Sequence, residues 1–234
     1  MITEHGSSKI FDKLNADERI SHAKDQYKDG LIMSTSFGIQ SAVMLHLVKQ
    51  HLSDIPIIFI DTGYLFQETY SYAQLLTKQL DLNVKIFKSK VSKMEQEKKY
   101  GKLWEQGKSG LEKYNQINKV EPMQRGLNEL KATAWISGIR REQSKSRKYR
   151  PVVEKQNNWV KIYPIIDWNE KQIESYIKKF NLPPHPLKSK GYVSVGDWHS
   201  SEPLRENMTA EETRFQGIKR ECGLHLDFDQ GGGI

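Results

Sequence analysis

The stretch "GLIMSTSFGIQSAVMLHL", residues 30–47, decides how this chain is expected to fold. It opens with the apolar run Leu31–Met33, passes through small residues to Gly38, and continues with apolar residues such as Met44 and Leu45 at helical spacing. A short apolar run followed by a glycine and then a helical pattern is typical of a buried strand, a tight turn and a helix. Residues 1–30 precede it as a polar segment that we expect to be helical.

The same alternation continues along the chain. Strands are expected over 57–60, 83–87, 133–139 and 159–165, with helices over 66–80 and 167–180. In the last helix, Asp167 is the expected N-cap and Glu170 completes a box-like pattern. Residues 88–131 contain Pro122 and several glycines, so we expect short helices and loops there rather than a second domain.

Alternating strands and helices predict an α/β fold with a parallel, twisted sheet and helices on both faces. We expect a single domain over residues 1–234, with a ligand-binding core at about 28–205. The remainder, about 206–234, ends in three glycines and is expected to form a mobile C-terminal tail.

Composition narrows the possible environments and partners. No apolar run approaches the roughly 20 residues that span a bilayer, and the N-terminus has no signal-peptide pattern, so we expect a cytoplasmic protein without a membrane partner. Because the chain has one cysteine, it forms no internal disulfide and no cysteine-ligated metal site, and we expect no bound cofactor or metal. The net charge of +7 indicates an anionic partner: nucleic acid, a membrane surface or a small polyanion.

Ligands of such sheets bind beyond the carboxyl ends of the strands. The loop "STSFGIQSA", residues 34–42, offers backbone N–H groups and serine hydroxyls there, as an anion cradle would. An ordinary turn whose serines cap the helix explains it as well. The loop matches neither a P-loop nor a dinucleotide-binding glycine motif.

Two more strand ends carry polar side chains. The stretch "SGIRREQSKSRKYR", residues 137–150, contains six cationic side chains. They could bind phosphates, form a solvated face or contact nucleic acid. Nucleic-acid binding would favour interleaved aromatic residues, and Tyr149 is the only aromatic residue here. Asp61, after the second strand, suits a ribose hydroxyl or an adenine amine, although an Asx-turn explains it equally well.

The only cysteine, Cys222, lies in the polar segment "KRECGLH", residues 219–225. A structural cysteine is usually buried among apolar neighbours, so a reactive thiol is the better interpretation. Lys219, Arg220 and a protonated His225 would favour the thiolate, and Glu221 opposes it.

Two family resemblances follow from these motifs. Residues 36–41, "SFGIQS", resemble the S-G-G-x-D-S loop of adenine nucleotide alpha-hydrolase-like proteins, with Phe37 in place of a glycine and Gln40 in place of the acid. A glutamine there disfavours Mg²⁺-dependent splitting of ATP. The segment "ETRFQGIKRECGLH" resembles the C-terminal signature of 3′-phosphoadenylyl sulfate (PAPS) reductases. Further segments of this family appear in order: "STSFGIQSAVMLHL", "DTGYLFQETY", "NKVEPMQRGL", "SGIRREQSKSR", "YPIIDWNEKQI" and "HPLKSKGYVSVGDWHS".

The resemblance to PAPS reductases implies a reaction and partners. It implies reduction of PAPS to sulfite and adenosine 3′,5′-bisphosphate by way of a Cys222 S-sulfonate, with reduced thioredoxin or glutaredoxin as electron donor, in a homodimer that binds no nucleic acid. Related adenylyl sulfate (APS) reductases hold an iron–sulfur cluster with additional cysteines, which this chain lacks, so the 3′-phosphorylated substrate is favoured.

The resemblance also implies places for the site residues. Ser34, Ser36, Gly38, Gln40 and Ser41 are expected around the phosphosulfate, and Asp61 and Thr62 at the adenosine. Arg140 and Arg141, with Lys131 and Arg147, are expected near the nucleotide phosphates, and Arg220 and His225 near the sulfate. Gly138 is also expected among the substrate-binding residues. The alternatives are an APS-preferring reductase, an ATP-using adenylyltransferase or pyrophosphatase of the same fold, and a basic nucleic-acid-binding protein.

Overall fold

The computed structural model describes residues 4–215, and a six-stranded sheet in the order β3-β2-β1-β4-β6-β5 runs through this part of the chain. Five strands are parallel, as predicted, and β5 pairs antiparallel with β6. The strands are β1 (Leu31–Thr35), β2 (Ile57–Asp61), β3 (Val84–Lys88), β4 (Ala134–Ile136), β5 (Val153–Gln156) and β6 (Trp159–Ile162).

The antiparallel strand β5 was not predicted. It joins β6 through Asn157 and Asn158, and Asn157 takes the left-handed backbone conformation that tight hairpin turns require. The sequence of β5, "VEKQ", contains two charged residues and no apolar alternation, because this strand lies at the edge of the sheet. An edge strand of this composition carries little periodic signal.

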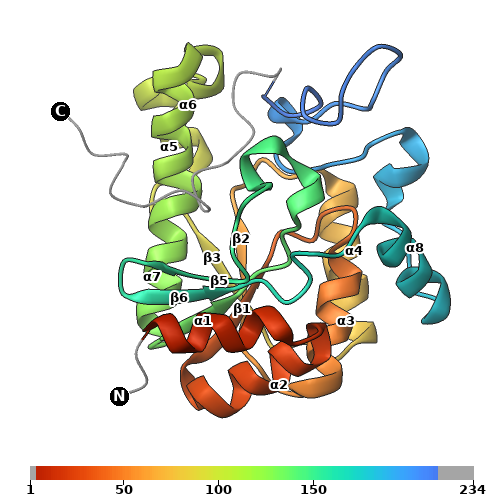
Figure 1. Ribbon diagram of the computed structural model, residues 1–234. Coiled ribbons are helices and arrows are strands. Elements are labelled where there is room, and N and C mark those ends of the chain that lie inside the picture. Colours follow the sequence, from red (N-terminus) through yellow and green to blue (C-terminus); the bar gives the residue numbers. More distant parts are fainter. Residues whose placement is uncertain (1–3, 216–234) are drawn as a thin grey trace.

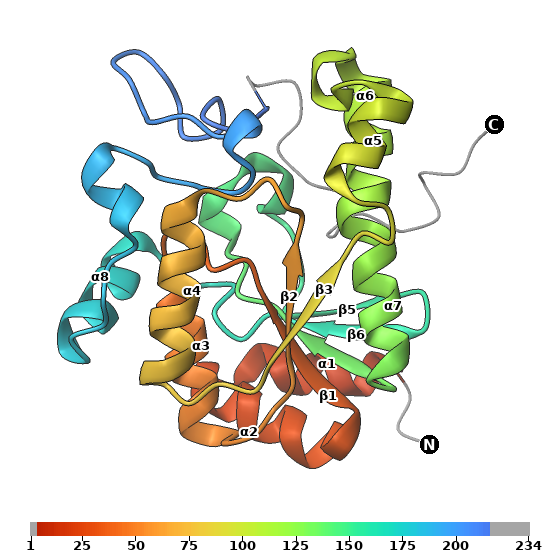
Figure 2. The ribbon, with the colours of Figure 1, turned by 180° about the vertical axis from the view of Figure 1, so that it is seen from behind.

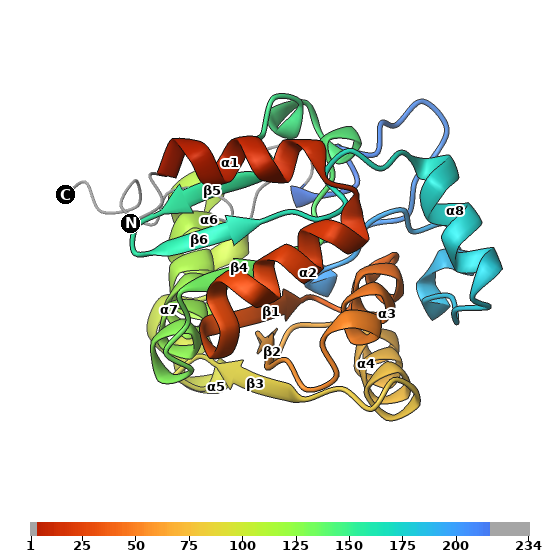
Figure 3. The same ribbon diagram turned by 60° about the horizontal axis from the view of Figure 1, so that its bottom comes forward.

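Helices cover both faces of the sheet, as predicted (Figures 1 and 3). On one face lie α1 (Glu4–Lys13), α2 (Ala16–Tyr27), α3 (Ser41–His51) and α4 (Gln67–Gln79), with α8 (Glu170–Lys179) against α3. On the other face α7 (Glu121–Glu129) packs on β2 and β3, and α5 (Lys93–Tyr100) and α6 (Gly107–Asn115) extend beyond it (Figure 2). Within residues 4–215, no helix is both long and apolar enough to cross a membrane.

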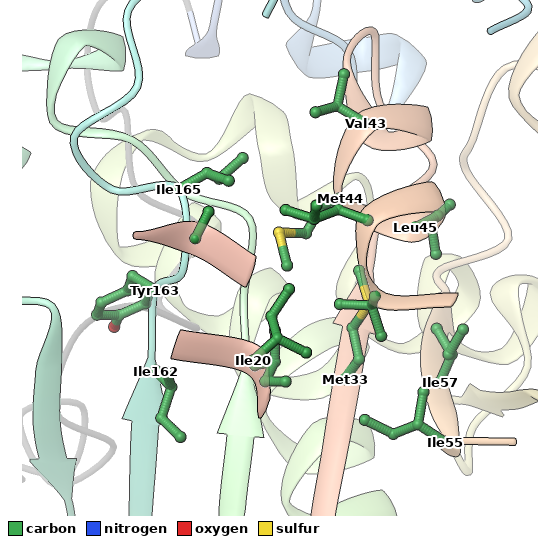
Figure 4. Close-up of a cluster of buried hydrophobic side chains, with 14 of the residues drawn as sticks. Ile20, Met33, Val43, Met44, Leu45, Ile55, Ile57, Ile162, Tyr163 and Ile165 are labelled. Atoms are coloured by element: carbon green, nitrogen blue, oxygen red, sulfur yellow. The ribbon is translucent and has the colours of Figure 1, made fainter. Parts of the chain in front are cut away.

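The alternation of side chains along the strands divides the core in two. Met33 and Ile57 face α2 and α3, where they meet Ile20 and Met44 in the larger cluster (Figure 4). Their neighbours Ile32, Ile58 and Trp135 point to the opposite face and pack with Met123 and Leu127 of α7. The two clusters hold the strands from both sides and so fix the position of the loops at their carboxyl ends.

Residues 88–131 are more regular than the sequence indicated. The helices α6 and α7 join through a π-helical turn, Gln116–Val120, into one continuous helical segment from Gly107 to Glu129. The N–H of Glu121 donates to the carbonyl of Gln116, one residue further back than in an α-helix. Pro122 has no N–H to donate, so it indicated a break in sequence, and the structure accommodates it in the first turn of α7.

The N-cap of α8 also differs from the prediction. Asn169, not Asp167, accepts a hydrogen bond from the N–H of Gln172, whose side chain accepts from the N–H of Asn169 in return. Asp167 instead pairs in bidentate fashion with Arg19 of α2, whose side chain is 3% exposed. The sequence predicts a capping box here. It does not show that Asp167 pairs with the buried Arg19, which lies 148 positions away in the chain.

Candidate functional site

A cavity of about 890 Å³ opens at the carboxyl ends of β1, β2 and β4. Its lining includes Ser34 and Ser36 after β1, Thr62 after β2, and Gly138 after β4. The order β2-β1-β4 places a crossover between β1 and β4, the position at which parallel sheets leave room for a ligand. Figures 1 and 2 show the segment 191–215, in blue, on the side toward which β2 points.

The loop of residues 36–41, called here the anion loop, forms one wall. Phe37 adopts a left-handed backbone conformation (φ 47°) and its ring is fully buried, so the loop turns sharply into α3. The Ser41 hydroxyl donates to the carbonyl of Gly38 at 2.9 Å. Within residues 4–215, the N–H groups of Gly38, Ile39 and Gln40 donate no hydrogen bond. These donors, at the N-terminus of the eleven-residue helix α3, suit an anion.

Gln40 is held by a network of charged side chains. Its amide oxygen accepts from Nη2 of Arg140 at 2.6 Å, and its amide nitrogen donates to Glu170. Arg140, 3% exposed, also pairs with Glu170 at 2.9 Å and Glu142 at 3.4 Å, and donates to the carbonyl of Trp168. The guanidinium therefore fixes Gln40 at the end of the anion loop, with two carboxylates around it.

Other predicted residues line the same cavity. The Ser34 hydroxyl accepts from the indole nitrogen of Trp135 at 2.5 Å, and Arg147 donates to the side chain of Gln143 at 2.6 Å. Gly138 lies where a β-carbon would come within 3.1 Å of Met44, so the backbone of this loop approaches α3 closely. The structure thus brings Ser34, Ser36, Gly38, Gln40, Ser41, Thr62, Gly138, Arg140 and Arg147 to one cavity.

A buried ion pair that the sequence did not predict also lines the cavity. Nζ of Lys119, in the π-helical turn, is 2.6 Å from Oδ2 of Asp197. The Thr62 hydroxyl donates to Oδ1 of the same carboxylate at 2.5 Å. Burial alone would raise the pKa of Asp197, but the charge of Lys119 and the hydrogen bond from Thr62 hold this pKa below its usual range.

Aromatic side chains surround this pair. His199 stacks on Trp104, with ring centroids 4.3 Å apart, and meets Tyr64 and Tyr114 edge-on. Burial lowers the pKa of His199 to about 4, although Asp197 acts in the opposite direction, so this imidazole is neutral at pH 7. Burial also raises the pKa of Tyr114 above its usual range. Lys119 is therefore the cation in direct contact with Asp197, and the adjacent side chains of His199 and Tyr114 are neutral.

The segment from Lys188 to Phe215 completes the cavity. Lys188, Tyr192 and Arg214 line it, and Ser201 and Arg214 form an isolated antiparallel bridge. The last described residue, Phe215, is 4% exposed, and its ring centroid lies 5.5 Å from Nζ of Lys119. Residues 206–215, assigned to the tail by sequence, thus include part of the cavity wall.

Three predicted residues do not join the cavity. Asp61 faces β3: Tyr70 donates to it at 2.6 Å and Lys88 pairs with it at 2.9 Å. Burial opposes its ionisation, yet these partners hold the pKa of Asp61 below its usual range. Arg141 donates to the carbonyl of Arg150 outside the cavity. Lys131 is exposed just before β4, at the opposite edge of the sheet, because a residue that precedes a strand lies at its amino end.

Cys222, Arg220 and His225 lie outside the described residues, so their predicted roles stay predictions. Residues that line the cavity without having been predicted include Lys119, Glu142, Glu170, Lys188, Asp197 and Arg214. Nothing in the sequence distinguishes Lys119 from the many other lysines of residues 88–131. Asp197 lies in a loop that does not follow a strand, so its position in the sequence does not indicate a ligand site. Among residues 4–215 no three His, Cys, Asp or Glu side chains gather as metal ligands would.

Comparisons with known proteins agree with one another. Residues 30–203 match the model of the phosphoadenosine phosphosulfate reductase domain. Phosphoadenosine 5′-phosphosulfate reductases are 50% identical in Zymomonas mobilis, over 94% of this chain and 90% of the relative, and 53% identical in Vibrio parahaemolyticus, over 92% and 83%.

Solved structures show the same relationship. The crystal structure of a phosphoadenylyl-sulfate reductase from Candida auris, a phosphate complex, has a TM-score of 0.74 at 30% identity and covers 86% of this chain and 98% of that chain. An FMN adenylyltransferase from Candida glabrata, with a TM-score of 0.59 at 16% identity over 83% of this chain and 66% of its own, shares the fold alone.

Proposed function

This chain belongs to the phosphoadenosine phosphosulfate reductase family, and we propose that it reduces 3′-phosphoadenylyl sulfate to sulfite and adenosine 3′,5′-bisphosphate. One observation carries the proposal. The anion loop and Lys119 both line the cavity, and the ring centroid of Phe215, which follows the lining residue Arg214, lies 5.5 Å from Nζ of Lys119. Cys222 follows Phe215 seven positions later, a span of at most about 25 Å.

The lining suits a nucleotide that carries several anionic groups. Apolar side chains from strands and helices provide a surface for the adenosine: Met33, Met44, Ile58, Ile60, Met123 and Ile165. The N–H groups of the anion loop and the side chains of Lys119, Arg147 and Arg214 suit the phosphates and the sulfate. The phosphate complex of the Candida auris relative supports an anion-binding role for this family of sites.

In the proposed first step, the Cys222 thiolate attacks the sulfur of the sulfuryl group. The bond between that sulfur and the bridging phosphate oxygen breaks, and adenosine 3′,5′-bisphosphate leaves with the electron pair. A cysteine S-sulfonate remains on Cys222. Cationic side chains at the cavity would stabilise the charge that develops on the leaving phosphate.

In the second step, reduced thioredoxin or glutaredoxin supplies two electrons. Its thiolate attacks Sγ of Cys222, sulfite leaves, and a mixed disulfide forms. The donor's second thiol then attacks its own sulfur in that disulfide, which releases the Cys222 thiol and oxidised donor. A single cysteine per chain supports an external donor, because this protein cannot form an internal disulfide with Cys222.

Intact mass measurement tests the first step. Incubation with PAPS in the absence of any donor is expected to give a sulfonate adduct, which the Cys222→Ser variant lacks. Both proteins should bind adenosine 3′,5′-bisphosphate equally well in calorimetry, since the substitution changes one atom. Sulfite production that survives Cys222→Ser would refute the mechanism.

Parallel reactions address the finer assignments. Slower adduct formation with APS than with PAPS is expected, because the 3′-phosphate adds a charge for the basic lining to bind. Reduced thioredoxin and glutaredoxin, compared at equal concentration, identify the donor. Robust Mg²⁺-dependent release of pyrophosphate from ATP would instead favour the adenylyltransferase alternative. We further propose a homodimer of the reducing cytoplasm, which sedimentation and fractionation would test.

A further inference from the structure

The buried pair of Lys119 and Asp197 is held from two directions. Asp197 is completely buried, and both of its carboxylate oxygens are engaged, Oδ2 with Lys119 at 2.6 Å and Oδ1 with Thr62 at 2.5 Å. Thr62 follows β2, and Lys119 belongs to the π-helical turn before α7. One carboxylate therefore joins the central sheet to the helical segment on its far face.

The backbone around Asp197 is fixed as well. The N–H of Trp198 donates to the carbonyl of Tyr64 at 2.9 Å, and Asp197 forms an isolated antiparallel bridge with Leu65. These contacts attach the loop after residue 191 to the loop between β2 and α4. Because backbone and side chain are both held, the carboxylate has one position, and the lysine that binds it has one position too.

Lys119 lies close to two parts of the proposed site, the cavity and Phe215. It lines the same cavity as the anion loop, and its Nζ lies 5.5 Å from the ring centroid of Phe215, the point from which the chain continues to Cys222. A lysine side chain has four rotatable bonds, so without a partner its ammonium group would not stay in one position. The pairing with Asp197 removes that freedom before any ligand arrives.

Two other buried arginines of the described residues form ion pairs, but their acids are about half exposed. Arg140–Glu170 lies in the cavity wall beside the anion loop. Arg19–Asp167 joins α2 to the loop before α8, outside the cavity. A buried ion pair contributes little net stability compared with apolar residues of the same size, because both charges must leave water. A pair retained in a cavity wall therefore points to a role in placing charge.

The titratable groups around the pair differ in charge. His199 and Tyr114 are neutral at pH 7, because burial lowers the pKa of His199 to about 4 and raises that of Tyr114. Around them, burial and the charge of Asp197 raise the pKa of Tyr64 and Tyr70, Glu97 and Asp61 act on these two tyrosines, and Arg214 acts on His199. Asp197 is the carboxylate in direct contact with Lys119.

We propose that Asp197 is a positioning residue for sulfuryl transfer: it fixes the Lys119 ammonium between the anion loop and the start of the Cys222 segment, where the sulfate of the substrate would lie. The inference rests on the proposed function, since it assigns a task within that reaction. Asp197 touches neither substrate nor thiol in this scheme and acts through Lys119. Thr62 donates a hydrogen bond to the same carboxylate, so its removal should lower the transfer rate less than removal of Asp197.

The test separates the chemical step from ligand binding. Single-turnover formation of the Cys222 sulfonate is followed by intact mass, and affinity for adenosine 3′,5′-bisphosphate, which lacks the sulfate, by calorimetry. Asp197→Asn keeps the volume and loses the ion pair. We expect the transfer rate to fall about thirtyfold while the Kd for the bisphosphate changes by less than about threefold. Asp197→Glu should restore part of the rate.

Asp167→Asn is the control, because it removes the acidic partner of a buried arginine outside the cavity. It should lower the melting temperature and leave the transfer rate unchanged. If Asp197→Asn does not fold, Thr62→Val decides instead, with an expected rate loss of about fivefold that exceeds any loss of bisphosphate affinity.

The inference is overturned if Asp197→Asn, or Thr62→Val in its place, transfers sulfonate at the wild-type rate. It is also overturned if rate and bisphosphate affinity fall together by the same factor, since that indicates a damaged cavity. A wild-type protein that forms no sulfonate adduct would remove the proposed function itself, an outcome distinct from a wild type that reacts and a variant that reacts equally fast.

Discussion

Arg140 and Arg141 are adjacent in sequence and differ in what surrounds them. The guanidinium of Arg140 is buried in the cavity wall, where it holds Gln40 and Glu170. Arg141 donates to the carbonyl of Arg150 and does not line the cavity. The basic stretch predicted cations at a ligand site, but the pattern alone could not show which of two neighbours faces the ligand, because a loop has no fixed periodicity.

Replacement of each arginine by lysine tests this difference. Arg140→Lys loses the planar fork that contacts Gln40 and Glu170 at once, so the anion loop should lose its fixed end. The Kd for adenosine 3′,5′-bisphosphate is expected to rise about tenfold in calorimetry. Arg141→Lys should change this Kd by less than about threefold. An equal loss in both variants would contradict the separation seen in the structure.

Phe37 shows why the anion loop was only partly predictable. The sequence identified the loop, and it marked Phe37 as a departure from a glycine in the resembling family. The structure keeps the left-handed backbone that a glycine would favour (φ 47°), at a cost of about 1–2 kcal/mol. Burial of the ring against Phe59, with centroids 4.9 Å apart, offsets that cost. No local pattern predicts such a compensation.

At the scale of elements, prediction succeeded where periodicity was strong. The strands β1, β2 and β4 and the helices α3 and α4 were expected from apolar runs and helical spacing, and all are present. The segment between Gly107 and Glu129 was underestimated because Gly110 and Pro122 are usually helix breakers. Gly110 is needed there for packing, since a β-carbon would lie 2.2 Å from the carbonyl oxygen of Leu103.

The capping of α8 gives a prediction at this scale. Asn169→Ala removes the side chain that accepts from the N–H of Gln172, and the free energy of unfolding should fall by about 1 kcal/mol in urea denaturation. Because Glu170 begins the same helix, the Kd for adenosine 3′,5′-bisphosphate should rise slightly. Asn169→Ser or Asn169→Asp, which also cap helices, should retain the stability; a loss with these residues too would contradict the assignment.

For the whole molecule, buried histidines set how stability depends on pH. His185 is 1% exposed, and burial lowers its pKa to about 4 despite the charge of Glu68; the pKa of His199 is likewise about 4. In the unfolded chain both would take up a proton near pH 6.5. Between pH 6.5 and 4 the unfolded state therefore binds more protons, and stability falls as pH falls.

We expect each histidine to lower the free energy of unfolding by up to about 1.4 kcal/mol per pH unit in this window. Urea denaturation at pH 7, 6, 5 and 4.5 measures the slope, and His185→Gln should make it shallower. Asp61, Asp167 and Asp197, whose pKa values lie below the usual range, lose their contribution only at lower pH. A stability that does not change between pH 7 and 4.5 would contradict the neutral state of both histidines.

The parallel sheet, and a ligand site at the carboxyl ends of its strands, could be predicted from the sequence because both depend on repeated local patterns. The Lys119–Asp197 pair did not, since its members are 78 positions apart and neither lies at the end of a predicted strand. Polar side chains that meet only through tertiary packing leave no spacing to detect. The site was thus predictable in its location and only partly in its charges.

The π-helical turn has a consequence for how relatives of this chain should be aligned. Its extra residue shifts the angular phase of everything that precedes it by about 100° relative to an uninterrupted α-helix. A homologue one residue shorter within Gln116–Val120 would have a regular α-helix there, with the residues before the turn rotated relative to α7. A single-residue gap in that stretch therefore marks a difference in which side chain faces the ligand, even where the letters on either side agree.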